Sequence, residues 1–151
     1  MIQRVQSIWL LLAAVAILCL LFVPVLIDKS SGGTYILYGS GIKFWHNDVA
    51  DQSANAPLFI STILAGLISV VNIFNFRNRK LQIRITSLNI ILILGLSFWL
   101  SNLAKQLPGG IEKADIGVGL FLPLLAIIFL YLAIRGIKKD EKLIRSADRI
   151  R

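Results

Sequence analysis

The chain has 151 residues, 56% of them hydrophobic, and a mean hydropathy of +0.77; about 45–50% of residues are apolar in ordinary soluble domains. The ordinary water-soluble class is therefore excluded, and the bilayer is expected to be part of the solvent. Sixteen Lys and Arg outnumber eight Asp and Glu, giving a net charge of +8 that would favour nucleic-acid binding in a soluble protein. The single cysteine, Cys19, excludes an internal disulfide and a metal site built on a pair of thiols.

Four apolar stretches are long enough to cross the membrane, since a helix needs about 20 apolar residues to cover about 30 Å of hydrocarbon. The first stretch follows a short basic start, is too long for a signal peptide and lacks a small-residue cleavage site, so it is expected to be a retained anchor. The sequence predicts an all-α four-helix bundle with spans at residues 7–27, 57–76, 85–103 and 116–134.

The first outer loop, residues 28–56, contains two β-prone runs, Thr34–Tyr38 and Ile42–Trp45, on either side of Gly39-Ser40-Gly41. This pattern predicts a β-hairpin with a three-residue loop. A lone hairpin is only marginally stable in water. Its aromatic side chains are therefore expected to rest on the outer membrane interface, or alternatively to dock a partner.

Spans two and three are joined by the short connection "RNRKLQIR", which forces them to lie side by side as an antiparallel helical hairpin. Asn72 lies four residues before the end of span two, and Asn89 lies four residues after the start of span three, so both amides are expected at similar depth. Interhelical hydrogen bonds of amides in hydrocarbon are worth about 0.6–2 kcal/mol. Four residues are predicted to be helix-packing polar groups, with substrate binding as the alternative: Asn72, Asn75, Ser87 and Asn89.

Small residues recur at every fourth position of span two, at Ser61, Ala65 and Ser69. Such a stripe lets another backbone approach closely, so it is predicted to be an interface with a partner. In span four, Pro123 would clash with the carbonyl of Gly119 in a regular helix, which predicts a local kink.

The C-terminal tail, residues 135–151, has the pattern of an amphipathic helix. Its apolar residues fall on one side of a helical wheel and its bases on the other, although Asp140 and Arg151 interrupt the apolar arc. Gly136 is expected to be a joint at which the chain turns onto the membrane plane. We therefore expect a cytoplasmic, surface-lying helix on an anionic leaflet, with a handle for another protein or a disordered segment as alternatives.

Lys and Arg are distributed unevenly across the predicted membrane. An even number of spans puts both termini on one side, and that side holds twelve of the sixteen bases, which indicates that both termini are cytoplasmic. Topology thus explains the excess charge, and no nucleic-acid partner is expected. A cytoplasmic basic face is expected to contact anionic lipids of the cytoplasmic leaflet; it comprises Arg77, Arg79, Lys80, Arg84, Lys138, Lys139, Lys142, Arg145 and Arg149.

The sequence offers little for catalysis. No ionisable side chain lies in the middle of a predicted span, which disfavours proton relays, charge-coupled transport and voltage sensing. Hydrolase, zinc-protease and phosphate-loop motifs are absent, and the sole histidine excludes haem held by two histidines of this chain. The segment "HNDVAD", with His46, Asp48 and Asp51, is only a weak candidate for a cation site. We expect no enzyme activity, no catalytic residue, no cofactor and no metal.

The start "MIQRVQSIWLLLA", the connection "RNRKLQIR" and the ending "AIRGIKKDEKLIRSADRIR" resemble a domain-of-unknown-function family of small four-span proteins in Bacteroidota-type bacteria. The similarity covers essentially the whole chain. The resemblance implies a bacterial inner-membrane location and a four-helix architecture, and it brings no activity or catalytic residue.

These features predict a single transmembrane domain that serves, without enzyme activity, as a small accessory or assembly subunit of a membrane complex. Its partner would be another membrane protein or a second copy of the chain. The alternative is a lipid- or small-molecule-binding membrane protein with a transport-related role and a polar pocket around Asn72, Asn75 and Asn89.

Overall fold

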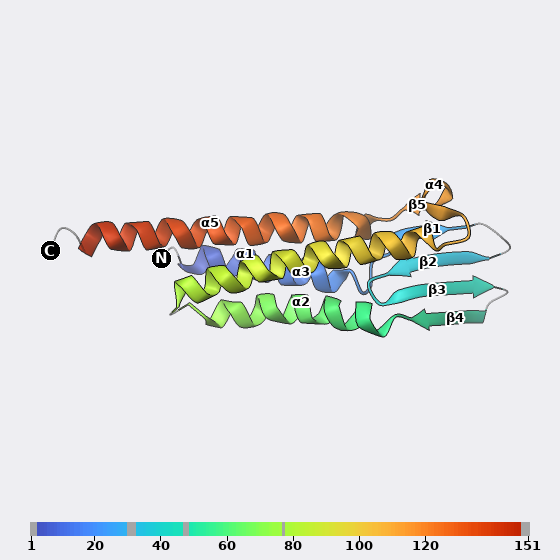
Figure 1. Cartoon of the computed structure of the whole chain (residues 1–151), viewed down its shortest axis with the longest axis horizontal. Helices are drawn as coiled ribbons and strands as arrows, with labels where there is room; N and C mark the ends of the chain where they lie inside the picture. The colour runs from blue at the N-terminus through green and yellow to red at the C-terminus, as the bar shows by residue number, and fades with distance from the viewer. Residues whose placement is uncertain (1–2, 30–32, 47–48, 77, 149–151) are drawn as a thin grey trace.

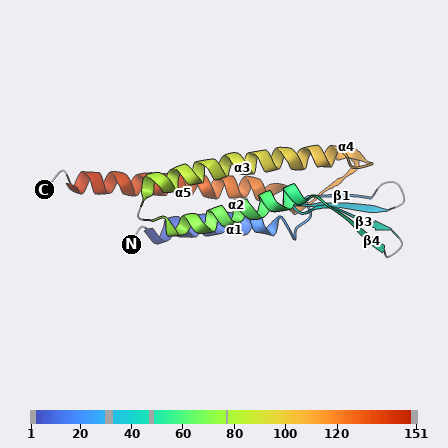
Figure 2. The same cartoon turned by 60° about the horizontal axis from the view of Figure 1, so that its bottom comes forward.

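The computed structural model describes residues 3–29, 33–46, 49–76 and 78–148, and most of them are helical. Within this part, a small antiparallel sheet extends from one end of a helical bundle, and both termini lie at the other end (Figures 1 and 2). Four long helices form the bundle: α1 (Gln3–Cys19), α2 (Ala56–Phe74), α3 (Arg79–Lys105) and α5 (Leu122–Asp148).

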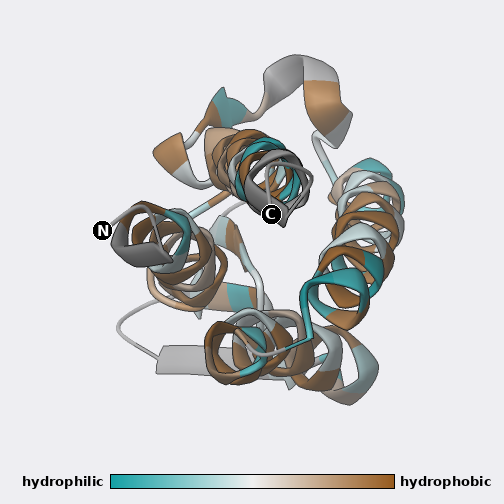
Figure 3. Cartoon of the chain, turned by 90° about the vertical axis from the view of Figure 1, so that its left-hand side faces the viewer, coloured by the Kyte–Doolittle hydropathy of each residue, from teal (hydrophilic) through white to brown (hydrophobic). Residues whose placement is uncertain are grey.

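The described helices are apolar enough for a membrane. Three segments have the length and hydropathy to cross one, at Ala56–Phe74, Arg79–Lys105 and Val118–Leu143, whereas the apolar helix Val5–Cys19 is shorter. Figure 3 looks along the bundle from the end with both termini and shows hydrophobic residues on the outward faces of the helices. Large apolar side chains such as Phe74 and Phe98 are mostly exposed there, which is compatible with a membrane protein.

Helix α1 is shorter than the predicted first span. It ends at Cys19, and Leu26–Asp28 forms strand β1, so the prediction of a helix continuing to residue 27 was wrong. Pro24 explains the difference, because proline has no N–H and disfavours the helical conformation of the residue before it. The β-branched residues Val25 and Ile27 then suit an extended strand.

The predicted hairpin is present as β2 (Thr34–Tyr38) and β3 (Gly41–His46). Its loop is shorter than the predicted three residues, because Tyr38 pairs with Gly41 and only two residues remain in the turn. Gly41 has a φ of 129°, a conformation that a residue without a Cβ adopts at little cost. The hairpin is therefore tighter than its sequence suggested.

The hairpin is part of a larger sheet that the sequence did not predict. Strand order is β4–β3–β2–β1–β5, with β4 at Val49–Ala54, β5 at Asp115–Ile116 and antiparallel pairing throughout. Because β5 pairs with β1, the sheet joins the segment between α1 and α2 to the segment between α3 and α5. Of the weak cation candidate, His46 ends β3 and Asp51 lies on β4, whereas Asp48 lies outside the described residues.

A buried carboxylate reinforces this junction. Asp28, at the end of β1, is fully buried and accepts a hydrogen bond from the Gly109 N–H at 2.8 Å, next to the short helix α4 (Gly110–Lys113). Nearby, Lys29 Nζ lies 3.0 Å from Asp115 Oδ2. That ion pair is exposed and contributes little, so Asp28 provides the stronger link between the two segments.

The hairpin turn lies against the bundle. The Gly39 N–H donates to the Leu20 carbonyl at 2.9 Å, and Thr62 Oγ1 of α2 donates to the Gly39 carbonyl at 3.3 Å. Leu20, Leu37 and Leu58 are fully buried around this point and belong to one hydrophobic core with the C-terminal part of α3. Hydrogen bonds and apolar packing thus attach the sheet to the helices.

Helices α1 and α5 form an antiparallel seam. Buried residues on both helices alternate at spacings of three and four, the pattern of knobs-into-holes packing. Small side chains along the seam let the two backbones approach closely. The buried stripes are Gln6, Leu10, Ala13 and Ile17 on α1, followed by Leu20 just after the helix, and Ala126, Leu130, Ala133, Ile137 and Asp140 on α5.

The tail continues this seam. Helix α5 passes through Gly136 to Asp148 without interruption, so the predicted joint at Gly136 and the separate surface-lying helix were wrong. A Cβ at Gly136 would lie only 3.2 Å from Gln6 Cγ, which places this glycine against α1. Asp140 was predicted to interrupt the apolar arc, but it is buried and accepts a hydrogen bond from Gln6 Nε2. These contacts hold the start of the tail on α1.

The predicted kink in span four is also absent, because α5 begins later than expected. A short 3₁₀ helix, η1 (Val118–Phe121), precedes α5, and Pro123 is the second residue of α5. Proline is favourable in the first turn of a helix, where its missing N–H has no intrahelical acceptor. Pro123 therefore helps to begin a helix and does not bend one.

Gly109→Ala should destabilise the fold, because the new Cβ would lie 2.6 Å from Asp28 Oδ1. We expect a loss of about 1–3 kcal/mol, measured by unfolding of the purified protein in detergent. Gly95→Ala is the control: Gly95 lies within α3 and has open space on the side where a Cβ would be added, so that change should be neutral or stabilise by about 0.5–1 kcal/mol. Equal stability of the two variants would contradict the tight contact at Asp28.

Candidate functional site: a groove between α2 and α3

Asn72 of α2 reaches across to the backbone of α3. Its Nδ2 donates to the Gln82 carbonyl at 3.1 Å and to Thr86 Oγ1 at 2.8 Å. In return, Gln82 Nε2 donates to the Asn72 carbonyl at 3.1 Å. All three residues are at least nine-tenths buried, so these bonds form in a dry interface between the helices.

Asn89 of α3 makes the equivalent contact in the other direction, with α2. Its Nδ2 donates to the Ala65 carbonyl at 3.0 Å and to Ser69 Oγ at 2.8 Å. Ser69 Oγ itself donates to the Ala65 carbonyl, as Thr86 Oγ1 donates to that of Gln82. Each asparagine thus binds a carbonyl and the hydroxyl one turn further along the facing helix.

A short repeat in the sequence underlies this symmetry. Ser69 precedes Asn72 by three residues, and Thr86 precedes Asn89 by three residues. Two antiparallel helices that carry the same hydroxyl–asparagine spacing can each present the hydroxyl to the other's amide. We call these four residues, Ser69, Asn72, Thr86 and Asn89, the asparagine clasp.

The clasp leaves two acceptors unused. Asn72 Oδ1 and Asn89 Oδ1 are buried and have no hydrogen-bond partner among the described residues. Rotating either amide would place Oδ1 against a backbone carbonyl, which cannot donate, so the observed orientation is the favoured one. A buried acceptor without a donor costs about 1–3 kcal/mol, and such a group calls for an explanation.

Both asparagines line a groove of about 440 Å³ between α2 and α3. Apolar side chains make up most of its wall, and Val71 and Leu88 beside the clasp are more than half exposed. The groove therefore offers an apolar surface whose lining includes the two asparagines with unused acceptors. Its lining residues are Leu67, Ile68, Val71, Asn72, Asn75, Ile85, Leu88, Asn89 and Leu92.

The other predicted packing residues lie elsewhere. Asn75 is the C-cap of α2 and lines the groove. Ser87 is exposed and takes no part in the interface between the helices, so its predicted packing role was wrong. Sequence reasoning missed Gln82 and Thr86, although both lie in α3 at the four-residue spacing that places side chains on one helical face.

The small-residue stripe faces the protein's own interior. Ala65 and Ser69 are buried and accept the Asn89 amide, while Ser61 is half-buried and donates to the Leu58 carbonyl. The prediction that this stripe is a surface for an external partner was therefore wrong for Ala65 and Ser69. Their small size instead lets α3 approach α2 closely.

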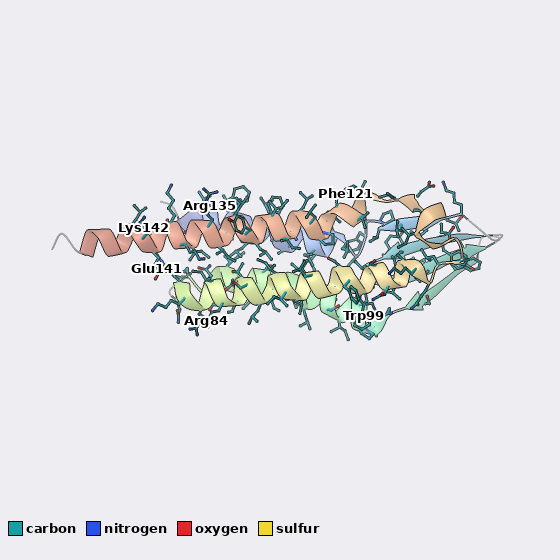
Figure 4. All side chains as sticks on the ribbon, turned by 45° about the horizontal axis from the view of Figure 1, so that its top comes forward. Arg84, Trp99, Phe121, Arg135, Glu141 and Lys142 are labelled. Carbon is teal, nitrogen blue, oxygen red and sulfur yellow. The ribbon has the colours of Figure 1, made fainter. Side chains whose placement is uncertain are left out.

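Bases gather at the end of the bundle that carries both termini. Figure 4 shows Arg84, Arg135 and Lys142 towards this end, with the aromatic side chains of Trp99 and Phe121 nearer the sheet. Arg77 and Arg149 of the predicted basic face lie outside the described residues, and the Arg145 side chain is not described. Its remaining members lie on two helices: Arg79, Lys80 and Arg84 on α3, and Lys138, Lys139 and Lys142 on α5.

The chain matches a family model described as Domain of unknown function (DUF4293) over residues 2–150. It therefore belongs to this family, which confirms the expected domain-of-unknown-function membership. No curated protein and no solved structure matches the chain.

Removing either amide of the clasp should weaken the α2–α3 interface. Asn72→Ala and Asn89→Ala each delete two hydrogen bonds between the helices, so each should cost about 0.6–2 kcal/mol. The measurement is a titration of the purified protein with sodium dodecyl sulfate, followed by circular dichroism. Ser87→Ala, the exposed control on α3, should change stability by less than about 0.5 kcal/mol; a control loss as large as that of Asn89→Ala would contradict the clasp.

Proposed function

We propose that the protein is an integral membrane protein of the bacterial inner membrane, crossed by all four long helices, with both termini in the cytoplasm. Three helices long enough to span support this proposal, as does the collection of bases at the end with the termini. Helix α2 is 19 residues long, which corresponds to about 28 Å and matches the hydrocarbon core. The resemblance to Bacteroidota-type proteins supports the bacterial location.

We further propose that the protein has no enzyme activity and is a small accessory or assembly subunit that binds a transmembrane helix of a partner protein in the α2–α3 groove. The observation behind this is the pair of buried acceptors, Asn72 Oδ1 and Asn89 Oδ1, beneath an apolar groove. A partner helix carrying hydrogen-bond donors would cover the groove and satisfy both acceptors. Val71 and Leu88 are exposed, so their side chains are able to move aside for it.

The depth of the acceptors favours a helix over a lipid. Asn89 bonds to Ala65, the middle residue of α2, about 14 Å from either end of that helix. Lipids carry their hydrogen-bond donors in the headgroup, so a lipid has none at this depth. A transmembrane helix places Ser, Thr, Asn or Gln side chains at any depth.

The same geometry indicates the spacing of the partner's donors. Asn72 faces the segment between Gln82 and Thr86, whose midpoint lies five residues before Asn89. Five residues correspond to about 7.5 Å along a helix. Two donors on the partner helix, separated by about 7.5 Å along its axis, would therefore meet both acceptors.

A second candidate function is binding of a lipid or another small amphiphile, with a transport-related role. The apolar wall of the groove favours it, because that wall could hold a hydrocarbon chain. In this case Asn75, at the cytoplasmic end of α2, would contact the polar end of the ligand, and the deeper Asn89 acceptor would stay unused.

Photo-crosslinking at the groove should capture the partner helix. A photoreactive residue replacing Leu88 inside the groove should give one discrete protein adduct in intact membranes, identified by mass spectrometry. Leu94, also exposed on α3, does not line the groove, and the same replacement there should give no such adduct. A single lipid adduct confined to position 88, on a monomeric protein, would support the second candidate function instead. An adduct between two copies of the chain would assign the groove to self-association.

The proposed orientation can be tested with single cysteines in a Cys19→Ser background. Trp45 of β3 and Lys142 of α5 are both exposed, near the two opposite ends of the molecule. We expect a membrane-impermeant maleimide to label Trp45→Cys in intact spheroplasts and Lys142→Cys only after permeabilisation. The reverse pattern would contradict cytoplasmic termini, and equal labelling of both sites in intact spheroplasts would contradict a membrane-spanning arrangement.

A further inference from the structure

A second cavity lies at the end of the bundle that carries the termini. It has a volume of about 320 Å³, and its wall combines apolar and polar side chains from three helices and the connection after α2. It lies apart from the α2–α3 groove, sharing none of the groove's lining residues. Its lining residues are Gln6, Ser7, Ile73, Phe74, Phe76, Arg79 and Gln82.

Arg79 is the group in this wall with unused hydrogen-bonding capacity. Its Nη1 is buried and has no hydrogen-bond partner among the described residues. The neighbouring amide nitrogens donate elsewhere, Gln82 Nε2 to the Asn72 carbonyl and Gln6 Nε2 to Asp140, and neither amide oxygen accepts from Arg79 Nη1. No ion pair joins Arg79 to Asp140 in the described part of the chain. Arg79 is half-buried and its guanidinium stays charged, so an acceptor from outside the chain would satisfy the buried Nη1.

The side chains of the cavity indicate the chemistry of that acceptor. Arginine presents a planar fork of donors that matches the oxygens of phosphate. On the same cavity, Phe74 and Phe76 are largely exposed apolar rings. We propose that this cavity binds a phosphate group on Arg79, either the phosphodiester of an anionic phospholipid whose acyl chain lies along Phe74 and Phe76, or a soluble phosphate compound. The lipid source rests on the proposed membrane location, whereas the phosphate site does not.

Native mass spectrometry of the full chain in a nonionic detergent tests this proposal. Phosphatidylglycerol is the anionic probe, and phosphatidylcholine with matched acyl chains is the neutral headgroup control. We expect phosphatidylglycerol to bind more tightly, and Arg79→Ala to weaken its binding about tenfold. Arg84→Ala, an exposed arginine on the same helix, should change binding less than twofold. Arg79→Gln is a second variant that keeps a long polar side chain if the alanine variant does not fold.

Inorganic phosphate distinguishes the two sources. Excess phosphate that displaces phosphatidylglycerol from the unchanged protein, but has no effect on Arg79→Gln, would assign the site to soluble phosphate compounds. Phosphatidylglycerol binding that resists phosphate and still depends on Arg79 would assign it to the lipid. Equal losses in the Arg79 and Arg84 variants would overturn the proposal, because general surface charge would then explain the binding. Equal binding of the two lipids would also overturn it, because binding would then depend on the matched acyl chains and not on an anionic headgroup. These outcomes leave the α2–α3 groove untouched, so the two proposals can fail separately.

Discussion

Helix α1 ends at Cys19, and the main-chain groups that follow it must find hydrogen-bond partners within the chain. The end of any helix leaves carbonyls without an intrahelical partner, and Leu20 and Val25, which follow α1, are buried. Local turns satisfy the first, since the Phe22 and Val23 N–H groups donate to Cys19. The next acceptors are met from far away in sequence: Leu20 by Gly39, Pro24 by Gly119 and Val25 by Gly117. The segment from residue 20 to residue 25 therefore positions the hairpin turn and the segment that precedes α5.

The rest of the architecture follows from these bonds. The hairpin turn is held by Leu20, and the segment before α5 is held by Pro24 and Val25, so both segments converge on β1. Helix α5 consequently starts beside the end of α1 and returns along it, with its apolar stripe facing that of α1 (Figures 1 and 2). The seam ends where Gln6 donates to Asp140, which explains why the tail continues as a helix past Gly136.

The sequence predicted local structure well where local chemistry decides it. Apolar length identified the helices, and Gly39 with the flanking β-prone runs identified the hairpin. Errors arose where a proline competes with a hydrophobic run, since hydropathy alone extended the first span through Pro24 and started the fourth before Pro123. Both prolines mark helix boundaries that their chemistry could have revealed. Strand β5 has only two residues, and no pattern that short predicts pairing with a strand almost ninety residues earlier.

The sequence predicted the two asparagines of the candidate site, but it did not predict which groups their side chains bind. Two asparagines on adjacent antiparallel helices were expected to lie at similar depth and to pack the helices, and each bonds to a carbonyl and a hydroxyl of the facing helix. That choice depends on the register of α2 against α3, which the close packing of Ala65 and Ser69 helps to set. Because both amide nitrogens donate within the clasp, only the buried Oδ1 atoms of Asn72 and Asn89 keep unused hydrogen-bonding capacity among the groups of these two side chains. If a partner helix binds in the groove as proposed, unused acceptors there would favour helices that carry donors, and the bonds that hold α2 to α3 would also set that preference.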